Sequence, residues 1–558
     1  MDNRITNLIN LLGCSIGVFV FCWVSPQLLD NTYLNRLVGF SCIAFISFAW
    51  LIFKSKLITI GHNARSILIA ITLYFLLQFI SMIWAENSLL LIYDAQKTIL
   101  LFAAFILGLA WHTNQKGKVW GFYSVAVLAI IYQGVFYWQL SNIDMIGRTQ
   151  LYGLTSLSGH KNLFSSFTLL LIILLAQLRN TACRKQTICA AVIITISLVS
   201  IGFAQSRSVL LGLTIGSLIG LIGWVTLYFR EKSRYWVIIL LVLVSTVSFS
   251  GLGIIPDDFF SKMVESESAQ ERIKIWHTTL SLVNQDYFLG KGAGNWPLLF
   301  PSGGLPDIAR IREESFIFFH VHNEYLKAYF ELGILGVLLF ILPFAQLLTT
   351  YSKQVYRLTD WFSPLILASL IAYMIVMFFD FPNSRPEHMV LVGLILAGAS
   401  CNSNCAKSRQ TSVVVKRELL LVGIICICFS IGISALRING EILTTELLDA
   451  RKEGKHENVI ELANRAENPM FTFDNTLVPL TWYAGNAHQQ LGELKLSVTE
   501  FQRAYSINPY NHHVLNNFAV SLSPFDEEKA EKLLKQAIRI NPDFEEAKEN
   551  LMLMRKNE

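Results

Sequence analysis

Charged residues are scarce in this chain of 558 residues: Asp, Glu, Lys and Arg together make up only 15% of it. A soluble globular domain carries about a quarter. Hydrophobic residues make up 53% of the chain and gather in long runs. The scarcity of charge excludes a purely soluble protein and indicates a polytopic membrane protein with room for a second, soluble part. The net charge of +5 gives no indication of a nucleic-acid partner.

Cysteine is missing from the two polar parts of the chain. All nine cysteines precede Asp449, and none lies in the long polar loop at about 255–320 or in residues 437–558. This excludes a disulfide framework and a Cys/His zinc site. The segment Gly290-Lys291-Gly292-Ala293-Gly294 does not lie between a strand and a helix, so we interpret it as a turn close to a ligand or another segment, and not as a nucleotide loop. We expect no metal and no other cofactor.

Long apolar runs supply the fold class. A membrane-spanning helix needs about 20 apolar residues, and thirteen runs qualify as candidates. They lie near residues 8–25, 34–53, 66–84, 95–112, 119–139, 162–178, 187–204, 208–229, 235–254, 324–349, 361–379, 388–402 and 418–436. We therefore predict an all-α membrane domain over residues 1–436, with a large outer loop at 255–320.

The orientation follows from the basic residues of the short loops. With a cytoplasmic N-terminus, each loop predicted to lie inside carries Lys or Arg, whereas the outer loops near 25–33 and 85–94 carry neither. An odd number of spans then places the C-terminal tail on the outer side, together with the long loop. In that loop, Ile273, Trp276, Leu280 and Val283 have helical spacing, which predicts a helix from about 270 to 283.

The tail, residues 437–558, has a different composition and contains a repeat. Ala504-x-x-x-Asn508-Pro509 recurs as Ala537-x-x-x-Asn541-Pro542, 33 residues later. Small and large residues fall where the tetratricopeptide pattern needs them. We predict a helical repeat domain that binds a protein partner. The alternative is a rigid cap that packs on the loop.

Polar residues gather where the long loop meets the apolar run at 324–349. His320, His322, Asn323 and Glu324 lie at the mouth of a membrane span, where titratable groups usually line a cavity or a substrate path. The plainer interpretation is that they are ordinary interfacial residues. We expect His320 to face away from His322, so His322 is the better candidate for a base near neutral pH.

Arg207 is the strongest candidate for a basic site residue on the outer face. It stands between two apolar runs with hardly any loop. Arginine suits bidentate recognition of phosphate. The alternative is that its side chain snorkels to lipid headgroups.

Several local patterns together resemble the O-antigen ligase family, which also holds O-antigen polymerases and bacterial O-oligosaccharyltransferases. His322-Asn323 followed after nine residues by Gly333-x-x-Gly336 is similar to the family's central motif. The other similar segments are Gly159-His160-Lys161-Asn162, Gln205-Ser206-Arg207-Ser208, Arg272-x-x-x-Trp276 and Gly290-x-Gly-x-Gly294-x-Trp296. His160-Lys161 departs from the family, which often has Pro or Gln there.

The resemblance implies a GT-C-like ligase fold in a bacterial inner membrane. It also implies metal-independent transfer of a glycan from undecaprenyl diphosphate to a hydroxyl acceptor on the periplasmic face. His322 is then the base, with Asn323 and Glu324 orienting it. The candidates for binding the diphosphate and glycan are Arg207, Arg272, Lys161, Asn162, His320 and Arg385.

The sequence does not identify the acceptor. It is lipid A-core or a similar lipid for a ligase, protein Ser/Thr for an oligosaccharyltransferase, and a growing glycan for a polymerase. Two interpretations belong to other classes. A transporter of lipid-linked glycans would show paired halves and midplane charges, and the chain shows neither. A scaffold would act through the tail alone.

Overall fold

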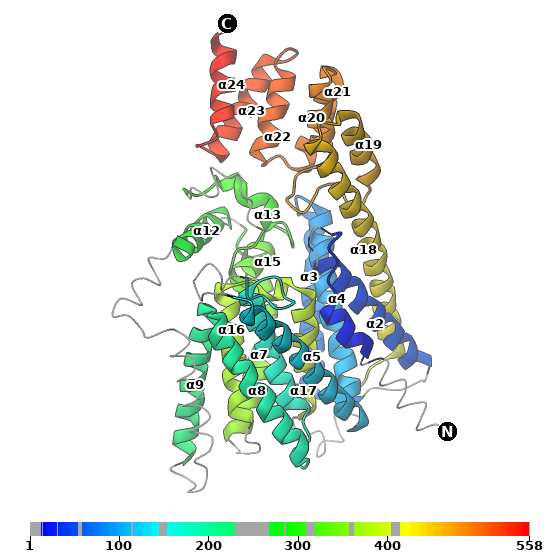
Figure 1. The fold of residues 1–558 in the computed structure, drawn as a ribbon, viewed down its shortest axis with the longest axis vertical. Helices are drawn as coiled ribbons and strands as arrows, with labels where there is room; N and C mark the ends of the chain where they lie inside the picture. Colours follow the sequence, from blue (N-terminus) through cyan, green and yellow to red (C-terminus); the bar gives the residue numbers. More distant parts are fainter. Residues whose placement is uncertain are drawn as a thin grey trace.

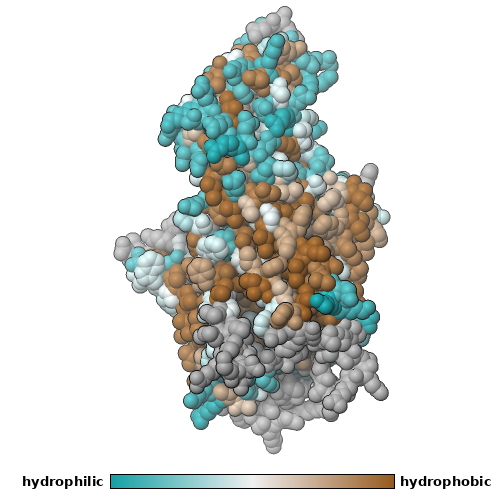
Figure 2. Space-filling model, turned by 90° about the vertical axis from the view of Figure 1, so that its right-hand side faces the viewer, coloured by the Kyte–Doolittle hydropathy of each residue, from teal (hydrophilic) through white to brown (hydrophobic). Residues whose placement is uncertain are grey.

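The computed structural model describes most of the membrane part and nearly all of the tail. The described residues are 13, 15–28, 30, 32–53, 59–112, 115–143, 153–228, 267–283, 286–307, 319–356, 362–402 and 413–556. Figure 1 shows a bundle of long helices with the tail stacked beyond one end of it. On the face that Figure 2 shows, apolar residues cover much of the bundle, whereas the tail is largely hydrophilic.

The bundle consists of apolar helices. They are α2 (Tyr33–Phe53), α3 (His62–Ile80), α4 (Ser88–His112), α5 (Gln115–Ser141), α7 (Lys161–Leu178), α8 (Arg184–Ala204), α9 (Arg207–Tyr228), α15 (Glu324–Tyr356), α16 (Ser363–Phe379), α17 (Pro386–Asn402) and α18 (Arg417–Lys452). Eight helices of the described residues are long and apolar enough to span a membrane, and three shorter apolar helices correspond to α9, α16 and α17.

The predicted spans agree with these helices. The eight long and three shorter helices match eleven of the thirteen predicted runs. Residues 15–22 of the first run are also helical, while the run at 235–254 lies outside the described residues. The prediction of an all-α polytopic membrane protein is confirmed. The only strands in the described part are β1 (Thr59–Ile60) and β2 (Val413–Val414), which pair antiparallel.

The centre of the bundle is α7, which is buried almost along its whole length. It packs on α5, α8, α16 and α17. Beside it, α9 and α16 approach each other closely, because Gly216 faces the backbone of Ala368. Small residues permit such close helix packing in a membrane, where apolar side chains gain little from leaving lipid.

The long loop forms a small lobe at the end of the bundle. It contains α12 (Glu267–Val283), α13 (Trp296–Leu299) and η2 (Phe300–Gly303), so the helix predicted from about 270 to 283 is confirmed. The lobe core includes Ile275, Val283, Trp296, Phe300 and Val321. Val321 belongs to the segment that carries both candidate histidines, so this core fixes one side of that segment.

The glycine-rich turn and the glycine motif of α15 fit into each other. Gly333 interrupts the helical geometry of α15 with φ 64° and ψ −162°. Gly290 also has a positive φ, of 72°. The turn then runs along the interrupted helix: Gly292 N donates to Glu331 O at 2.9 Å, and Ile334 N donates to Tyr287 O at 3.0 Å. The expectation that this turn lies against another segment is confirmed.

Replacing Gly333 by alanine is expected to destabilise the protein strongly. An added Cβ would lie 2.2 Å from Phe288 O, and the positive φ alone costs a residue with a side chain about 1–3 kcal/mol. The measurement is the thermal unfolding temperature of the detergent-purified variant. Gly432→Ala is the matched control, because no atom lies within 4 Å of the added Cβ there. Equal unfolding temperatures for the two variants would contradict this account.

The tail continues directly from α18, which passes through position 437 without a break. It contains α19 (His456–Ala466), α20 (Leu480–Gln490), α21 (Leu494–Ile507), α22 (His512–Leu522), α23 (Glu527–Ile540) and α24 (Glu545–Lys556). The repeated alanines, Ala504 and Ala537, are both fully buried in a shared core. Successive helices pack on each other, as the repeat predicts. The tetratricopeptide assignment and the division into domains at 436/437 stay predictions.

Candidate functional site

The candidate site is centred on Asp380, the residue at which α16 ends. Its Oδ2 accepts a hydrogen bond from Asn162 Nδ2 at 2.8 Å, and its Oδ1 lies 3.8 Å from His322 Nδ1. Asn162 lies in the first turn of α7, and His322 lies two residues before the start of α15. The ends of three helices therefore bring two predicted site residues to one carboxylate.

Asp380 stays ionised in this position. It is only 3% exposed, and burial by itself would raise the pKa of its carboxyl. The neighbouring His322, followed by the charges of Arg272 and His160, outweighs burial and lowers the pKa to about 2. A buried carboxylate that stays negative gives the imidazole beside it a fixed anionic partner.

The backbone turns sharply at His322, which has a φ of 53°. Most residues with a side chain avoid this region, and where it occurs it often marks a functional position. The side chain is 23% exposed, so one part of the ring reaches the surface of the site while Nδ1 faces Asp380.

Asn323 and Glu324 are placed differently from the prediction that they orient the imidazole. Asn323 Oδ1 accepts from Leu326 N at 2.9 Å and caps the start of α15. Glu324 Oε1 accepts from Asn383 N at 2.8 Å. Asn383 belongs to η3 (Pro382–Ser384), which follows Asp380. The described contacts thus give Asn323 a role in the helix, and give Glu324 a role in holding the turn that carries Asp380.

His320 and His322 both lie against Phe381. The ring of His320 stacks on it at 3.8 Å with an angle of 16°, and the ring of His322 meets it edge-on at 5.0 Å. The expectation that they face opposite sides is wrong, because residues two positions apart in an extended segment lie on the same face, and both rings contact Phe381. Burial, and then the positive charges of His322 and Lys327, lower the pKa of His320 well below its usual value. A neutral ring suits stacking on an aromatic ring.

Several cationic side chains lie near the Asp380–His322 pair or next to residues that do. Arg272 of α12 lies close enough to Asp380 for its charge to affect the carboxyl. Lys161 and Arg207 begin α7 and α9, and they are near enough for their like charges to interact. His160 caps α7 by accepting from Asn162 N at 3.2 Å. Burial, and then the charges of Lys161, His322 and Arg272 against that of Asp380, lower the pKa of His160. The result is a cluster with more positive than negative groups.

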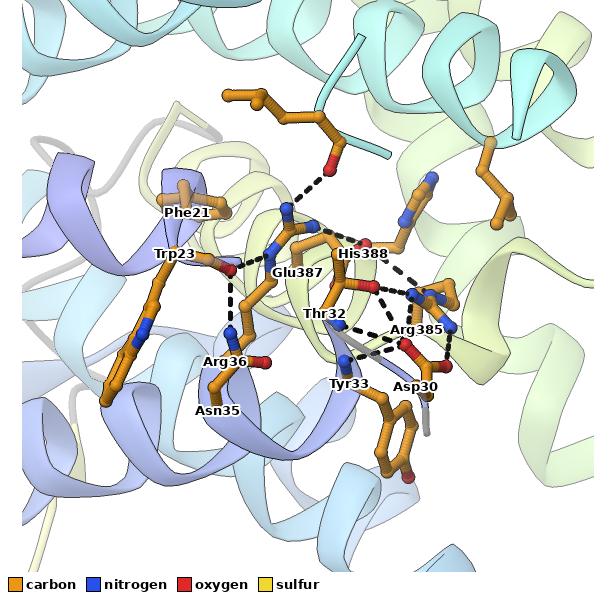
Figure 3. A network of polar contacts seen from close by, with 12 residues as sticks. Phe21, Trp23, Asp30, Thr32, Tyr33, Asn35, Arg36, Arg385, Glu387 and His388 are labelled. Carbon is orange, nitrogen blue, oxygen red and sulfur yellow. Dashed lines mark hydrogen bonds and ion pairs between the residues drawn. The ribbon is translucent and has the colours of Figure 1, made fainter. Parts of the chain in front are cut away.

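Arg385 is bound to carboxylates outside this cluster. Its Nη1 lies 2.7 Å from Asp30 Oδ2 and its Nε lies 3.6 Å from Glu387 Oε1, as Figure 3 shows. The same oxygen, Glu387 Oε1, lies 3.1 Å from Arg36 Nη1, and both of these side chains are fully buried. The described contacts do not support the predicted role of Arg385 in binding substrate. They show instead that the turn after Asp380 is anchored to the N-terminal part of the chain.

A second buried ion cluster lies near His320. Asp94 Oδ1 accepts from Lys97 Nζ at 2.6 Å and from Lys327 Nζ at 2.8 Å. These contacts tie α4 to the first turn of α15. The cluster therefore fixes the start of α15, the helix that begins two residues after His322.

Asp380 and Phe381 were not among the predicted site residues. The signal that would have found Asp380 is an acidic residue directly after an apolar run, in a turn on the same side as His322. Among the residues that the structure describes, no group of three His, Cys, Asp or Glu side chains is arranged to hold a metal ion. Metal independence itself is not tested by this and stays a prediction.

Comparison with protein families gives one finding. Residues 190–341 match the family described as O-antigen ligase. None of the curated proteins compared with the chain matches it. The matched part contains Arg207, Arg272 and His322, whereas Asn162 and Asp380 lie outside it. The family supports enzymatic glycan transfer of the ligase type, with a lipid-linked glycan and membrane lipids as partners. The resemblance drawn from the motifs is thus confirmed: this multi-pass membrane protein carries an O-antigen ligase domain over residues 190–341.

Proposed function

We propose that the protein transfers a glycan from undecaprenyl diphosphate to a hydroxyl acceptor at the periplasmic face of a bacterial inner membrane. The observation that carries the proposal is the placement of His322 3.8 Å from the buried, ionised Asp380, with Arg272 near that carboxylate and the cations Lys161 and Arg207 near each other at the starts of α7 and α9. Such a site offers a base next to a binding place for an anion.

His322 is the base of the proposed reaction. Its Nδ1 faces Asp380, which leaves Nε2 to take the proton from the acceptor hydroxyl. The hydroxyl oxygen then bonds to the anomeric carbon of the glycan, while the bond from that carbon to the diphosphate oxygen breaks. Asp380 stabilises the imidazolium that forms, as a carboxylate does in other acid–base pairs.

The cations stabilise the leaving group. When the glycosidic bond breaks, its electron pair stays on the diphosphate, whose charge therefore grows. Arg207 and Arg272 present planar forks of donors that suit phosphate oxygens, and Lys161 adds a point charge. Asn162, which already donates to Asp380, keeps that carboxylate directed toward His322 and away from the anion.

The loops indicate on which side of the membrane the site lies. The His320–His322 segment lies at the end of the bundle that carries the tail, because Phe319 packs with Phe473 and Leu477 of the tail and the tail stands beyond one end of the bundle (Figure 1). Asp380 and the start of α7 belong to the same end, since Asp380 lies beside both His322 and Asn162. The basic residues at the starts of α5 and α8 follow the far ends of α4 and α7, and the charge rule assigns that side to the cytoplasm. This supports a cytoplasmic N-terminus and a periplasmic tail. The polar cluster at one end also suits a transferase better than a transporter, whose charges lie near the midplane.

The experiment that tests the proposal follows the glycan in cells. The gene is deleted and restored, and the lipid-linked polysaccharide and the glycoproteins are compared by blotting and mass spectrometry. We expect deletion to remove polysaccharide from a lipid A-core acceptor and to leave full-length chains on the undecaprenyl carrier.

Other outcomes of this experiment would correct the proposal. Loss of protein glycosylation with a decorated lipid anchor would make the protein an oligosaccharyltransferase. Shortened chains on the carrier would make it a polymerase. Unchanged glycans in the deletion strain would contradict glycan transfer altogether.

A further inference from the structure

We propose that the tail is part of the transfer site, because a hairpin in it (residues 468–479, the tail hairpin) seats Phe319 and thereby positions the His320–His322 segment. The inference rests on the proposed function of that segment. It gives the tail a role within the same chain, separate from any binding of a protein partner.

The tail hairpin packs directly on the membrane part. Phe473 and Leu477 share a buried cluster with Leu89 and Leu90 at the start of α4 and with Leu298 of α13, and Phe319 packs against that cluster. Phe319 is the residue immediately before His320. A side chain of the tail cluster and a candidate site residue are thus adjacent in the chain.

A second set of contacts joins the hairpin to α4. The ring of Phe473 meets that of Tyr93 edge-on at 6.2 Å, and the hydroxyl of Tyr93 donates to Met470 O. Tyr93 also lies under the guanidinium of Arg437, 3.7 Å from ring centroid to Cζ. The hairpin is therefore held on the membrane part by polar as well as apolar contacts.

The hairpin is internally rigid. Asp474, 5% exposed, accepts from Thr476 N at 2.7 Å and from Val478 N at 3.0 Å through Oδ1. Its Oδ2 accepts from Tyr483 OH at 2.7 Å. Leu477 adopts a positive φ of 57°, which a residue with a branched side chain keeps only when its surroundings hold it there. A rigid hairpin can fix the position of the segment that packs on it.

The repeated Asn-Pro turns connect this hairpin to the rest of the tail. Asn508 Nδ2 donates to Leu477 O at 2.9 Å. At the second repeat, Ile540 O accepts from Leu305 N at 2.7 Å, directly before Asn541. Both repeat turns therefore face the lobe and the hairpin, so the tail holds the site through more than one contact.

The His320–His322 segment is held from two sides. Phe319 belongs to the tail side, while Val321 is buried in the lobe core and its carbonyl accepts from Trp276 Nε1 at 2.9 Å. The two histidines between and after these anchors are left to contact Phe381 and Asp380. Loss of the tail anchor would loosen His322, and a misplacement of about 1 Å can cost about 10²-fold in rate.

The test compares Phe473→Ala with Phe525→Ala in the full chain. Phe525 is also a tail phenylalanine, but it is 52% exposed in the turn between α22 and α23. Amide hydrogen exchange is measured by mass spectrometry on peptides covering 319–326 and, as a check on tail folding, on α22. In Phe473→Ala we expect exchange at 319–323 to become about tenfold faster or more, with α22 unchanged. Phe525→Ala should behave like the wild type.

Phe319→Ala removes the other side of the same contact and should give the same faster amide hydrogen exchange at 320–323. This second variant tests the contact even if Phe473→Ala unfolds the tail. Unchanged exchange in both variants would overturn the proposal that the tail hairpin holds Phe319.

The activity of Phe473→Ala is expected to fall about 10²-fold in kcat, with little change in KM for the lipid-linked donor. Faster exchange together with unchanged transfer would leave the contact with Phe319 in place and refute the proposed role of the His320–His322 segment, so the two failures are distinguishable.

Discussion

Replacing His322 by alanine is expected to lower the rate of glycan transfer by about 10²- to 10⁴-fold, the range that a positioned acid–base group contributes. The imidazole is the group paired with the ionised Asp380, and alanine leaves nothing to take the proton of the acceptor hydroxyl. The measurement is the initial rate of transfer by the purified variant at saturating donor.

The neighbouring residues provide the controls for this variant. Asp380→Asn keeps the shape of the side chain and removes the charge that stabilises the imidazolium, so we expect a clear loss of kcat with normal donor binding. His320→Ala removes a ring that stacks on Phe381 and should cost less than His322→Ala. A His322→Ala protein that is folded and transfers glycan at the wild-type rate would remove the base from the proposed mechanism.

Replacing Arg36 by alanine is expected to destabilise the protein by about 3–5 kcal/mol, the cost of leaving one partner of a buried ion pair alone. Arg36 and Glu387 are both fully buried, 3.1 Å apart. Arg36 also donates to the carbonyls of Trp23 and Leu157. These contacts join the N-terminal segment to α17, as Figure 3 shows. The measurement is chemical unfolding of the purified protein in detergent.

Two variants show whether the effect comes from the buried charge. Lys452→Ala breaks an ion pair with Asp449 in which both side chains are largely exposed, and it should change stability little. Arg36→Met combined with Glu387→Leu removes both charges and should recover most of the lost stability. If Arg36→Ala is as stable as Lys452→Ala, the network does not anchor the turn that carries Asp380.

The parts of the fold that the sequence predicted are those with local causes. The spans follow from run length and hydropathy, and α12 follows from four apolar residues at helical spacing. The glycine-rich turn was identified because three alternate glycines suggest close backbone contact, and Gly290 does meet the backbone of Glu331. Each of these features depends on residues that are near one another in the chain.

The parts that escaped prediction depend on distant contacts. Asn162 and Asp380 are 218 residues apart, and Arg385 and Asp30 are 355 apart. Nothing local in the sequence says that Arg385 pairs with Asp30 while Arg272 stays near Asp380. The backbone at His322 was missed for a similar reason, because its left-handed turn is held by the lobe, the tail hairpin and α15 together.

The most direct test of the central claim uses purified protein, an undecaprenyl-diphosphate-linked glycan and a hydroxyl acceptor. Mass spectrometry follows both products, the glycosylated acceptor and the released undecaprenyl diphosphate. We predict that the wild type forms the two products in equal amounts and that His322→Ala forms both at least about 10²-fold more slowly, although it still binds the donor. Intact donor after incubation with the wild type, or equal product from His322→Ala, would contradict the account.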